Sequence, residues 1–518
     1  MKLYRSFATV GGLTGVSRVL GFVRDVLIAA VLGAGWVADA FFVAFRFPNL
    51  FRALFAEGAF NSAFVPLFSK RLEAEGADSA RLFAEQALAM LLAAVAVTVI
   101  LAEIFMPRLV AVLAPGFVED ARKFELAVLL SRITFPYILC MSLLALAAGL
   151  LNATGRFVAP AAAPILLNLV LSIAVSLAAW LGFHGRPEAG VVLAWGVAVA
   201  GFAQLAYVAL AARKAGMDLH FRRPRLNPAM RRLIALGVPG LITGGINQIN
   251  VFTGTMIASL QVSAVSYLYY ADRLNQLPLG IVGIAIAVVL LPELSRHLAQ
   301  KDEAAAMASM NRSLEFALIL TLPAAVALMI AAHPIIQVLF ERGAFSASDS
   351  LEVSRALAAF AAGLPAFVLA KVFLPGFFAR EDTRTPMIFA AVALVVNVAG
   401  SLALFFWIGH VGIAIATSVS GWVNAVMLAV TLARRGHFKP DAALRRRAPL
   451  LVLSSALMGG VLWFASAALG DFFPPVNGVL LQVGALAALV GSGLIAYAAA
   501  AQLTGAMTLA DLRRSLKR

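Results

Sequence analysis

Long apolar segments recur along the whole chain and constrain its fold more than any other feature. Fourteen segments are long and apolar enough to cross the hydrocarbon core of a bilayer as helices. Hydrophobic residues make up 62% of the chain and charged residues 13%, whereas a soluble protein carries about 25% charged residues. The sequence therefore predicts an all-α polytopic membrane protein with 14 transmembrane helices.

The predicted spans cover most of the chain and leave no room for a soluble domain. Their ranges are 8–33, 37–67, 84–113, 125–151, 158–182, 189–212, 231–258, 264–294, 312–340, 352–379, 386–408, 410–433, 448–470 and 477–502.

Positive charge falls almost wholly on one side of this predicted bundle. When the loops alternate between two sides, one side holds 28 Lys and Arg side chains and the other holds about four, Arg122, Lys123, Arg186 and Arg342. The positive-inside rule makes the richer side cytoplasmic, and an even number of spans places both termini there. The formal net charge of +15 then reflects topology, and no nucleic-acid partner is predicted.

The two halves of the chain resemble each other at an offset of 226 to 229 residues. The matched positions are 65–71 with 291–297, Val112-Leu113 with Val338-Leu339, Phe135-Pro136 with Leu364-Pro365, and Asn168 with Asn397. Six spans per copy mean that both copies enter the membrane from the same side, as in transporters with two parallel halves. The predicted organisation is two six-helix bundles, 1–215 and 216–436, followed by two extra helices and a cytoplasmic tail in 437–518.

Proline and glycine lie inside many of the predicted spans, for example Pro48, Pro136, Pro164, Pro278 and Pro365. Membrane helices tolerate these residues where neighbouring groups satisfy the freed backbone. Broken helices are therefore expected.

Charged side chains interrupt the first, second and eighth spans. They are Arg18, Arg24, Asp25, Asp39, Arg46, Arg52, Glu57, Asp272 and Arg273. An arginine at the centre of a membrane helix costs about 2.5 to 3.5 kcal/mol, so these side chains are expected to face a wet cavity. Two alternatives stay open: an ion pair of Arg24 with Asp25 or Asp39, and extension of Arg46, or of Lys371 in the span 352–379, to the bilayer surface.

The cluster carries more arginine than carboxylate, which favours an anionic ligand. The planar guanidinium matches the oxygens of phosphate or carboxylate with two parallel hydrogen bonds. Arg18 and Arg24 lie six residues apart, about 120° around an ideal helix. Both are expected to reach one anion only if the helix breaks between them, at Gly21.

Motifs for catalysis and nucleotide binding are missing from the sequence. It contains no GxxxxGK[ST], HExxH or GxSxG motif, and the six histidines lack metal-ligand spacing. The prediction is a secondary transporter, not an enzyme, without catalytic residues, metal or cofactor. An ion gradient, the membrane potential or downstream consumption of the product would supply the energy for uphill movement.

Several segments together resemble one known family. They are 12–25, 38–41, 51–60, 64–66, 270–273, 339–345 and 375–380. These segments are similar to those of the MurJ (MviN) lipid II flippases, which belong to the multidrug/oligosaccharidyl-lipid/polysaccharide exporter superfamily. The Arg-x-Leu-Phe-Ala-Glu-Gly-Ala-Phe run at 52–60 is the most specific of them, together with the arginine pair in the first span.

The resemblance implies a fold, a substrate and a set of site residues. The fold is two lobes around a cationic cavity, with a groove for a polyprenyl tail at the last two helices. The substrate is undecaprenyl-diphosphate-linked disaccharide pentapeptide, flipped across the bacterial inner membrane. Other peptidoglycan-synthesis proteins are possible partners. The residues it implies for substrate binding are Arg18, Arg24, Asp39, Arg52 and Arg273, with Ser17, Asp25, Arg46, Glu57 and Asp272 as secondary candidates.

Two other functions stay open. A flippase for another undecaprenyl-linked glycan, or a drug/cation antiporter of the same superfamily, would share the twelve-helix core. An antiporter that exports cations would favour a cavity dominated by carboxylates. A membrane enzyme that acts on lipid-linked sugars would need clustered loop carboxylates or metal ligands, which the sequence lacks.

Overall fold

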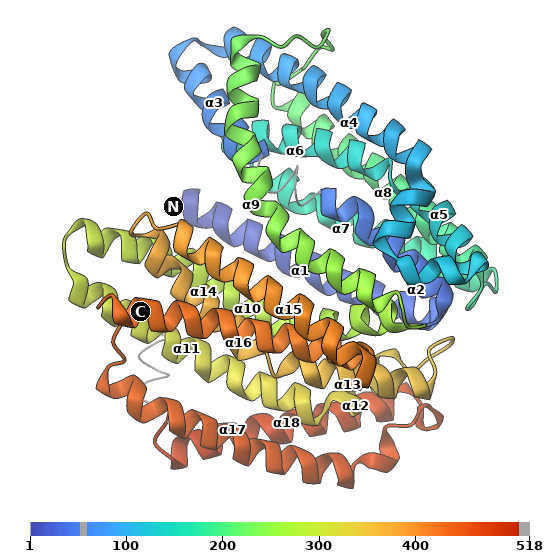
Figure 1. Cartoon of the computed structure of the whole chain (residues 1–518), viewed down its shortest axis with the longest axis vertical. Coiled ribbons are helices and arrows are strands. Elements are labelled where there is room, and N and C mark those ends of the chain that lie inside the picture. The colour runs from blue at the N-terminus through green and yellow to red at the C-terminus, as the bar shows by residue number, and fades with distance from the viewer. Residues whose placement is uncertain (1, 52–59, 507–518) are drawn as a thin grey trace. The chain divides into compact units, whose positions relative to one another are not determined.

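The computed structural model describes residues 2–51 and 60–506, and in this part of the chain it contains helices and no β-strand (Figure 1). The helices are α1 Lys2–Leu32, α2 Trp36–Phe51, α3 Phe60–Ala74, α4 Ala77–Leu113, η2 Pro115–Glu119, α5 Ala121–Thr134, α6 Tyr137–Ala153, α7 Val158–Trp180, α8 Pro187–Lys214, α9 Pro228–Ala258, α10 Ala264–Ala299, α11 Glu303–Ile330, α12 Ala332–Phe340, α13 Ala347–Ala361, α14 Leu364–Phe378, α15 Arg384–Ile408, α16 His410–Arg434, α17 Ala442–Ala468, η3 Gly470–Phe472, η4 Pro475–Asn477 and α18 Val479–Leu503.

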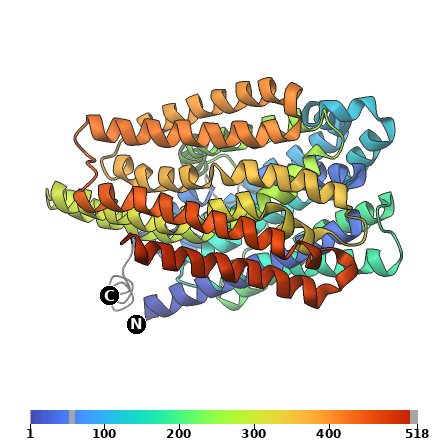
Figure 2. The same ribbon diagram turned by 90° about the horizontal axis from the view of Figure 1, so that it is seen from below.

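Packing divides the chain into two compact units. Unit 1 comprises Met1–Ser266 and Gly343–Phe345, and unit 2 comprises Tyr267–Arg342 and Ser346–Arg518. In unit 1, α7 packs against α1 and α8, and α5 packs against α2. In unit 2, α15 pairs with α16, and the pair of α17 and α18, red in Figure 2, packs on α11 through α17. The ranges 1–215, 216–436 and 437–518 rest on the sequence repeat and stay a prediction.

Helix length and exposed apolar surface agree with a polytopic membrane protein. Within the described residues, ten helical segments are long and apolar enough to cross a membrane. Only 11% of the most apolar part of α15 and 17% of that of α4 is buried inside the protein. Such surfaces are stable in lipid, where the bilayer is as apolar as the side chains. The ten segments correspond to ten predicted spans, and the remaining four (8–33, 37–67, 231–258 and 264–294) stay predictions.

Proline divides three of the predicted spans into two helices each. The span 125–151 is α5 and α6, separated at Phe135-Pro136, and the span 352–379 is α13 and α14, separated before Leu364-Pro365. The span 312–340 is α11 and α12, which meet at Ala331, three residues before Pro334. Proline lacks an N–H and its ring clashes with the carbonyl four residues earlier, so the helix stops. The expected breaks are therefore confirmed at Pro136 and Pro365.

Other prolines do not break their helices. Pro48, Pro164 and Pro278 lie inside α2, α7 and α10, which continue through them. For these three positions the expected break was wrong, because membrane helices can absorb a single missing hydrogen bond through neighbouring helices and local adjustment.

Helix boundaries repeat as the sequence does. The starts of α9, α11, α13 and α15 follow those of α1, α4, α5 and α7 by 226 residues in each case. Both ends of α1, at 2 and 32, recur in α9 at 228 and 258. The internal repeat predicted from short motifs therefore extends to the starts of four helices and, for α1 and α9, to the whole helix.

Two short loops each contact the end of a long helix from the other half of the repeat, within unit 1. Gly116 donates its N–H to Oγ of Ser259, which follows α9, at 3.1 Å. Ala344 donates its N–H to the carbonyl oxygen of Ala30 in α1 at 2.8 Å. A Cβ added to Gly116 or to Gly343 would lie 2.2 Å from the carbonyl oxygen of Ser259 or Ala30, respectively. Only glycine allows the two backbones to approach so closely.

Candidate functional site

Arg24 of α1 is buried and fully engaged by its neighbours. Its Nε and Nη2 donate to Oδ1 of Asp25 at 3.0 and 2.7 Å, and its Nη1 donates to Oδ1 of Asn168 on α7 at 2.9 Å. The guanidinium carbon lies 5.7 Å from the centre of the Phe45 ring. Of the two ion pairs proposed for Arg24 from the sequence, the pair with Asp25 is present.

Asn168 connects this ion pair to a second turn of α1. Its Nδ2 donates to the backbone oxygen of Ser17 at 2.7 Å and to Oγ of Ser17 at 3.3 Å. Ser17, Arg24, Asp25 and Asn168 are called the Arg24 network below. The sequence identified Asn168 only as a position of the repeat, since its partner helix is more than 140 residues away.

Arg18 lies next to the Arg24 network in sequence but is exposed. Within the described residues it makes no ion pair or side-chain hydrogen bond. Its guanidinium is therefore available to a ligand, whereas that of Arg24 already holds a carboxylate.

The helix break at Gly21 that would bring Arg18 and Arg24 to one anion is absent, because α1 continues from Lys2 to Leu32. A Cβ at Gly21 would lie 3.4 Å from Nδ2 of Asn168, so this glycine allows α1 and α7 to pack closely. Small residues commonly have this role between membrane helices.

Asp39 of α2 is fully buried and forms a second polar cluster with Lys123, Ser263 and Ser266. Its Oδ2 accepts a hydrogen bond from Nζ of Lys123 at 2.6 Å and from the N–H of Ser263 at 2.9 Å. Its Oδ1 accepts from the N–H and Oγ of Ser266, in the first turn of α10. A carboxylate is favourable there because the N–H groups of a helix start lack backbone partners.

Lys123 is the partner of Asp39 that sequence reasoning missed. The sequence places Lys123 among the four cations on the side of the bundle opposite the predicted cytoplasmic side, where it is expected in a loop. In the structure its side chain is only 5% exposed. Lys123 lies in the first turn of α5, where a cation is unfavourable to the helix dipole. A cation at this unfavourable position could have predicted a nearby acidic partner.

Arg46 of α2 reaches α9 within unit 1. Its Nη1 donates to Oγ1 of Thr255 at 2.8 Å, and the side chain is half-buried. This contact lies inside the protein, so the structure gives no support to extension of Arg46 to the bilayer surface.

The candidate residues of unit 2 lie on α10. Nη2 of Arg273 donates to the hydroxyl of Tyr269 at 2.9 Å, and the guanidinium lies over the Tyr269 ring, 4.8 Å from its centre. The carboxylate of Asp272 accepts a hydrogen bond from the side-chain amide of Gln276. Both Asp272 and Arg273 are half-buried. Arg52 and Glu57 lie outside the described residues.

The second asparagine of the repeat also lies in a polar cluster. Oδ1 of Asn397 accepts hydrogen bonds from Thr417 at 3.3 Å and Ser401 at 3.4 Å. Asn168 and Asn397 are both buried, so each unit places a polar amide between its helices at the matched position. In the described part of the chain, no group of three or more His, Cys, Asp or Glu side chains is arranged to hold a metal.

Two carboxylates, Glu85 and Asp382, each bind cationic side chains near the ends of helices. Glu85 of α4 accepts hydrogen bonds from Nε of Arg81 at 3.2 Å, from the N–H of His220 at 3.0 Å and from Nε of Arg222. Between α14 and α15, hydrogen bonds from Arg435 and Thr385 lower the pKa of Asp382 to about 2. These pairs fix loops to helices, and the sequence identified neither carboxylate as part of a site.

Comparisons with known proteins agree on one family. The family model "Lipid II flippase MurJ" matches residues 28–480. A Rhizobium meliloti (strain 1021) protein named "Probable lipid II flippase MurJ" is 50% identical over 100% of this chain and 97% of its own length. A Burkholderia cenocepacia protein named "Lipid II flippase MurJ" is 35% identical over 90% of each chain.

Solved structures with a similar fold fall into two groups. A structure described as "Lipid II flippase MurJ, inward closed conformation" has a TM-score of 0.78 and 26% identity, and covers 98% of this chain and 99% of its own. An inward-facing multidrug resistance MATE family transporter has a TM-score of 0.66 and 15% identity over 83% of this chain and 96% of its own. At this identity the second similarity concerns the fold alone. From the family model and the relatives that match along its length, this chain belongs to the lipid II flippase MurJ family.

Proposed function

We propose that this protein flips lipid II, the undecaprenyl-diphosphate-linked disaccharide pentapeptide, from the cytoplasmic to the periplasmic leaflet by alternating access. The observation that supports this most is the 50% identity over the whole chain with a protein named as a probable lipid II flippase. The diphosphate and the peptide carboxylates of lipid II are anionic, and the chain carries arginines within its predicted spans.

The proposed binding residues are Arg18, Arg24, Arg52 and Arg273, and Asp39 is proposed as a residue that holds the surrounding helices in place. Arg18 is exposed. In Arg24, by contrast, Nε and Nη2 bind Asp25, and Nη1 binds Asn168. Binding of a diphosphate by Arg24 therefore requires the anion to replace Asp25 as the acceptor. Such an exchange keeps the Arg24 charge paired with an anion in both the internal and the substrate-bound state.

The proposal includes a location and an energy source. The protein is a multi-pass protein of the bacterial inner membrane with both termini in the cytoplasm, because this orientation follows the positive-inside rule. Since the sequence has no phosphate-binding loop, transport is driven by an ion gradient or by the membrane potential, and no nucleotide or metal cofactor takes part.

A flippase for another undecaprenyl-linked glycan, or a drug/cation antiporter, is the alternative. Its support is the similarity in fold to MATE transporters at 15% identity, which is weaker than the full-length similarity to proteins named as lipid II flippases.

Growth complementation tests the proposed function. The chain is expressed in a bacterium depleted of its own lipid II flippase, and wild-type protein is expected to restore growth. A double variant, Arg24→Ala with Arg273→Ala, is expected to be inserted at a normal level and to fail. Normal growth with the double variant would contradict the cationic binding site, and failure of well-expressed wild-type protein would contradict the proposed substrate.

A further inference from the structure

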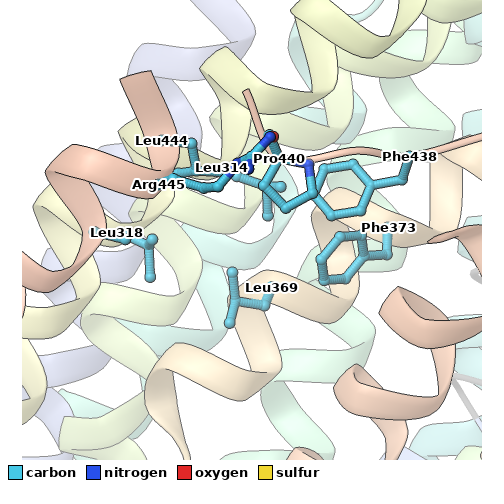
Figure 3. Close-up of a pocket in the computed structure, with 9 residues that line it drawn as sticks. Leu314, Leu318, Leu369, Phe373, Phe438, Pro440, Leu444 and Arg445 are labelled. Carbon is cyan, nitrogen blue, oxygen red and sulfur yellow. The ribbon is translucent and has the colours of Figure 1, made fainter. Parts of the chain in front are cut away.

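An apolar pocket of about 290 Å³ opens on unit 2 between α11, α14 and α17 (Figure 3). Each helix lines it with two side chains spaced four residues apart: Leu314 and Leu318, Leu369 and Phe373, Leu444 and Ala448. Residues at this spacing lie one above the other along a helix. The pocket is therefore lined along the helix axes, which is the direction of acyl chains beside a membrane-spanning helix.

A cation and an aromatic ring lie at one end of the pocket. Phe438 and Pro440 come from the loop before α17, and Arg445 comes from the first turn of α17. Nε of Arg445 donates to the carbonyl oxygen of Pro440 at 3.0 Å. Within the described residues, its two Nη groups make no hydrogen bond or ion pair, so they remain available to an anion.

The walls of the pocket are held in place without a ligand. Nδ2 of the buried Asn311 on α11 donates to the carbonyl oxygen of Lys439 at 3.0 Å, and its Oδ1 accepts from the N–H of Asp441 at 3.3 Å. The carboxylate of Asp441 accepts a hydrogen bond from the N–H of Leu444 at 2.7 Å and so caps α17. The loop thus lies fixed over the end of the pocket.

The charges around this end are unequal. Arg447 is neutralised by Glu315 of α11, whereas Arg445 and Arg446 are exposed and form no ion pair in the part of the chain that the structure describes. An apolar pocket that ends at one arginine without an ion pair among the described residues, Arg445, matches a lipid with apolar chains and an anionic head group. Basic pockets between membrane helices bind such head groups.

We propose that this pocket binds one acyl chain of an anionic membrane phospholipid, with the phosphate against the Nη groups of Arg445. The volume is at the lower end of the range for ligand pockets, about 300 to 1,000 Å³, so it holds part of a chain while the rest of the lipid stays in the bilayer. The basic residues of the chain's own C-terminal segment, such as Arg513 and Arg514, make that segment a poor occupant beside Arg445.

Native mass spectrometry of the delipidated full-length protein tests this proposal. The protein is incubated with dioleoyl phosphatidylglycerol or dioleoyl phosphatidylcholine, and bound lipids are counted. Wild-type protein is expected to retain one phosphatidylglycerol in preference to phosphatidylcholine. Arg445→Ala is expected to lower that preference about fivefold, the factor for one cation near an anionic surface. The matched control, Arg446→Ala, removes an adjacent exposed arginine that does not line the pocket and is expected to leave the preference unchanged.

A second pair of variants tests the apolar part. Leu369→Trp fills the pocket and is expected to remove the retained lipid, whereas Leu457→Trp, on an exposed face of α17, is expected to keep it. If Leu369→Trp does not give a monodisperse protein, Ala448→Leu narrows the pocket from α17 instead. Equal binding of both lipids by wild-type protein would overturn the proposal. Wild-type retention of phosphatidylglycerol by the pocket-filling variant, Leu369→Trp or its replacement Ala448→Leu, would also overturn it. Displacement of phosphatidylglycerol by undecaprenyl phosphate from wild-type protein would also overturn it, by assigning the pocket to the substrate's tail.

Discussion

Arg24 carries a charge that the protein balances internally, and this gives it a different role from that of Arg18. The Arg24 network uses Nε and both Nη groups of the guanidinium. Lysine would keep the charge but would lose the planar arrangement of donors. A conservative substitution at this position therefore separates geometry from charge.

We predict that Arg24→Lys yields inserted, folded protein with flipping reduced about tenfold or more, since each lost charge-assisted hydrogen bond is worth about 1.5 to 3 kcal/mol. Lipid II transport relative to the amount of protein in the membrane measures it. The sequence alone favours Arg81→Lys as a control, because Arg81 lies in a predicted cytoplasmic loop, but Arg81 binds Glu85. Arg232→Lys, at an exposed position, is the better control, and wild-type transport by Arg24→Lys would contradict the prediction.

The pair of Asp39 and Lys123 is expected to be structural. Lys123→Met leaves the carboxylate of Asp39 buried without its counter-ion, which costs about 3 to 5 kcal/mol. The midpoint of thermal unfolding in detergent should fall clearly, and Asp39→Asn combined with Lys123→Met should recover part of the loss. Arg122→Met changes an exposed neighbour and should have little effect. Equal unfolding midpoints for Lys123→Met and Arg122→Met would show that the pair contributes nothing.

At the scale of elements, two glycines allow loops to lie against helix ends. Gly116→Ala and Gly343→Ala each place a methyl group 2.2 Å from a carbonyl oxygen, so the loop must move away. We expect each variant to lose about 1 to 3 kcal/mol of stability, the usual cost of overpacking, measured as a lower thermal midpoint. Gly491→Ala in α18 has no atom within 4 Å of the added carbon and serves as the control. An unchanged midpoint in both loop variants would contradict this reading of the contacts.

Sequence patterns predicted the positions of the helices much better than the contacts between side chains of different helices. Apolar length located the segments, and the repeat was visible from motifs such as Phe135-Pro136 and Leu364-Pro365. Proline gave the right answer at Pro136 and the wrong one at Pro164, because the outcome depends on whether a neighbouring helix satisfies the freed carbonyl. Lys123 and Asn168 were missed as partners because their contacts join residues 84 and 144 positions apart, and the sequence alone does not specify such pairs.

At the scale of the whole molecule, the distribution of charge predicts the orientation in the membrane. A cysteine at Ala347 should react with a membrane-impermeant maleimide added to the periplasm, whereas one at Ala442 should react only after permeabilisation. Both positions are exposed, and the native Cys140 is buried. Labelling of the Ala347→Cys variant only from the cytoplasm, or of the Ala442→Cys variant from the periplasm, would contradict the proposed topology.

The leaflet occupied by lipid II tests the proposed function most directly. In cells depleted of their own flippase, labelled lipid II is assayed for access to a reagent confined to the periplasm. Expression of this protein is expected to make lipid II accessible, and the double variant Arg24→Ala with Arg273→Ala, present at the same level, is expected to leave it inaccessible. Lipid II that stays inaccessible with wild-type protein in the membrane, or becomes accessible with the double variant, would contradict the account.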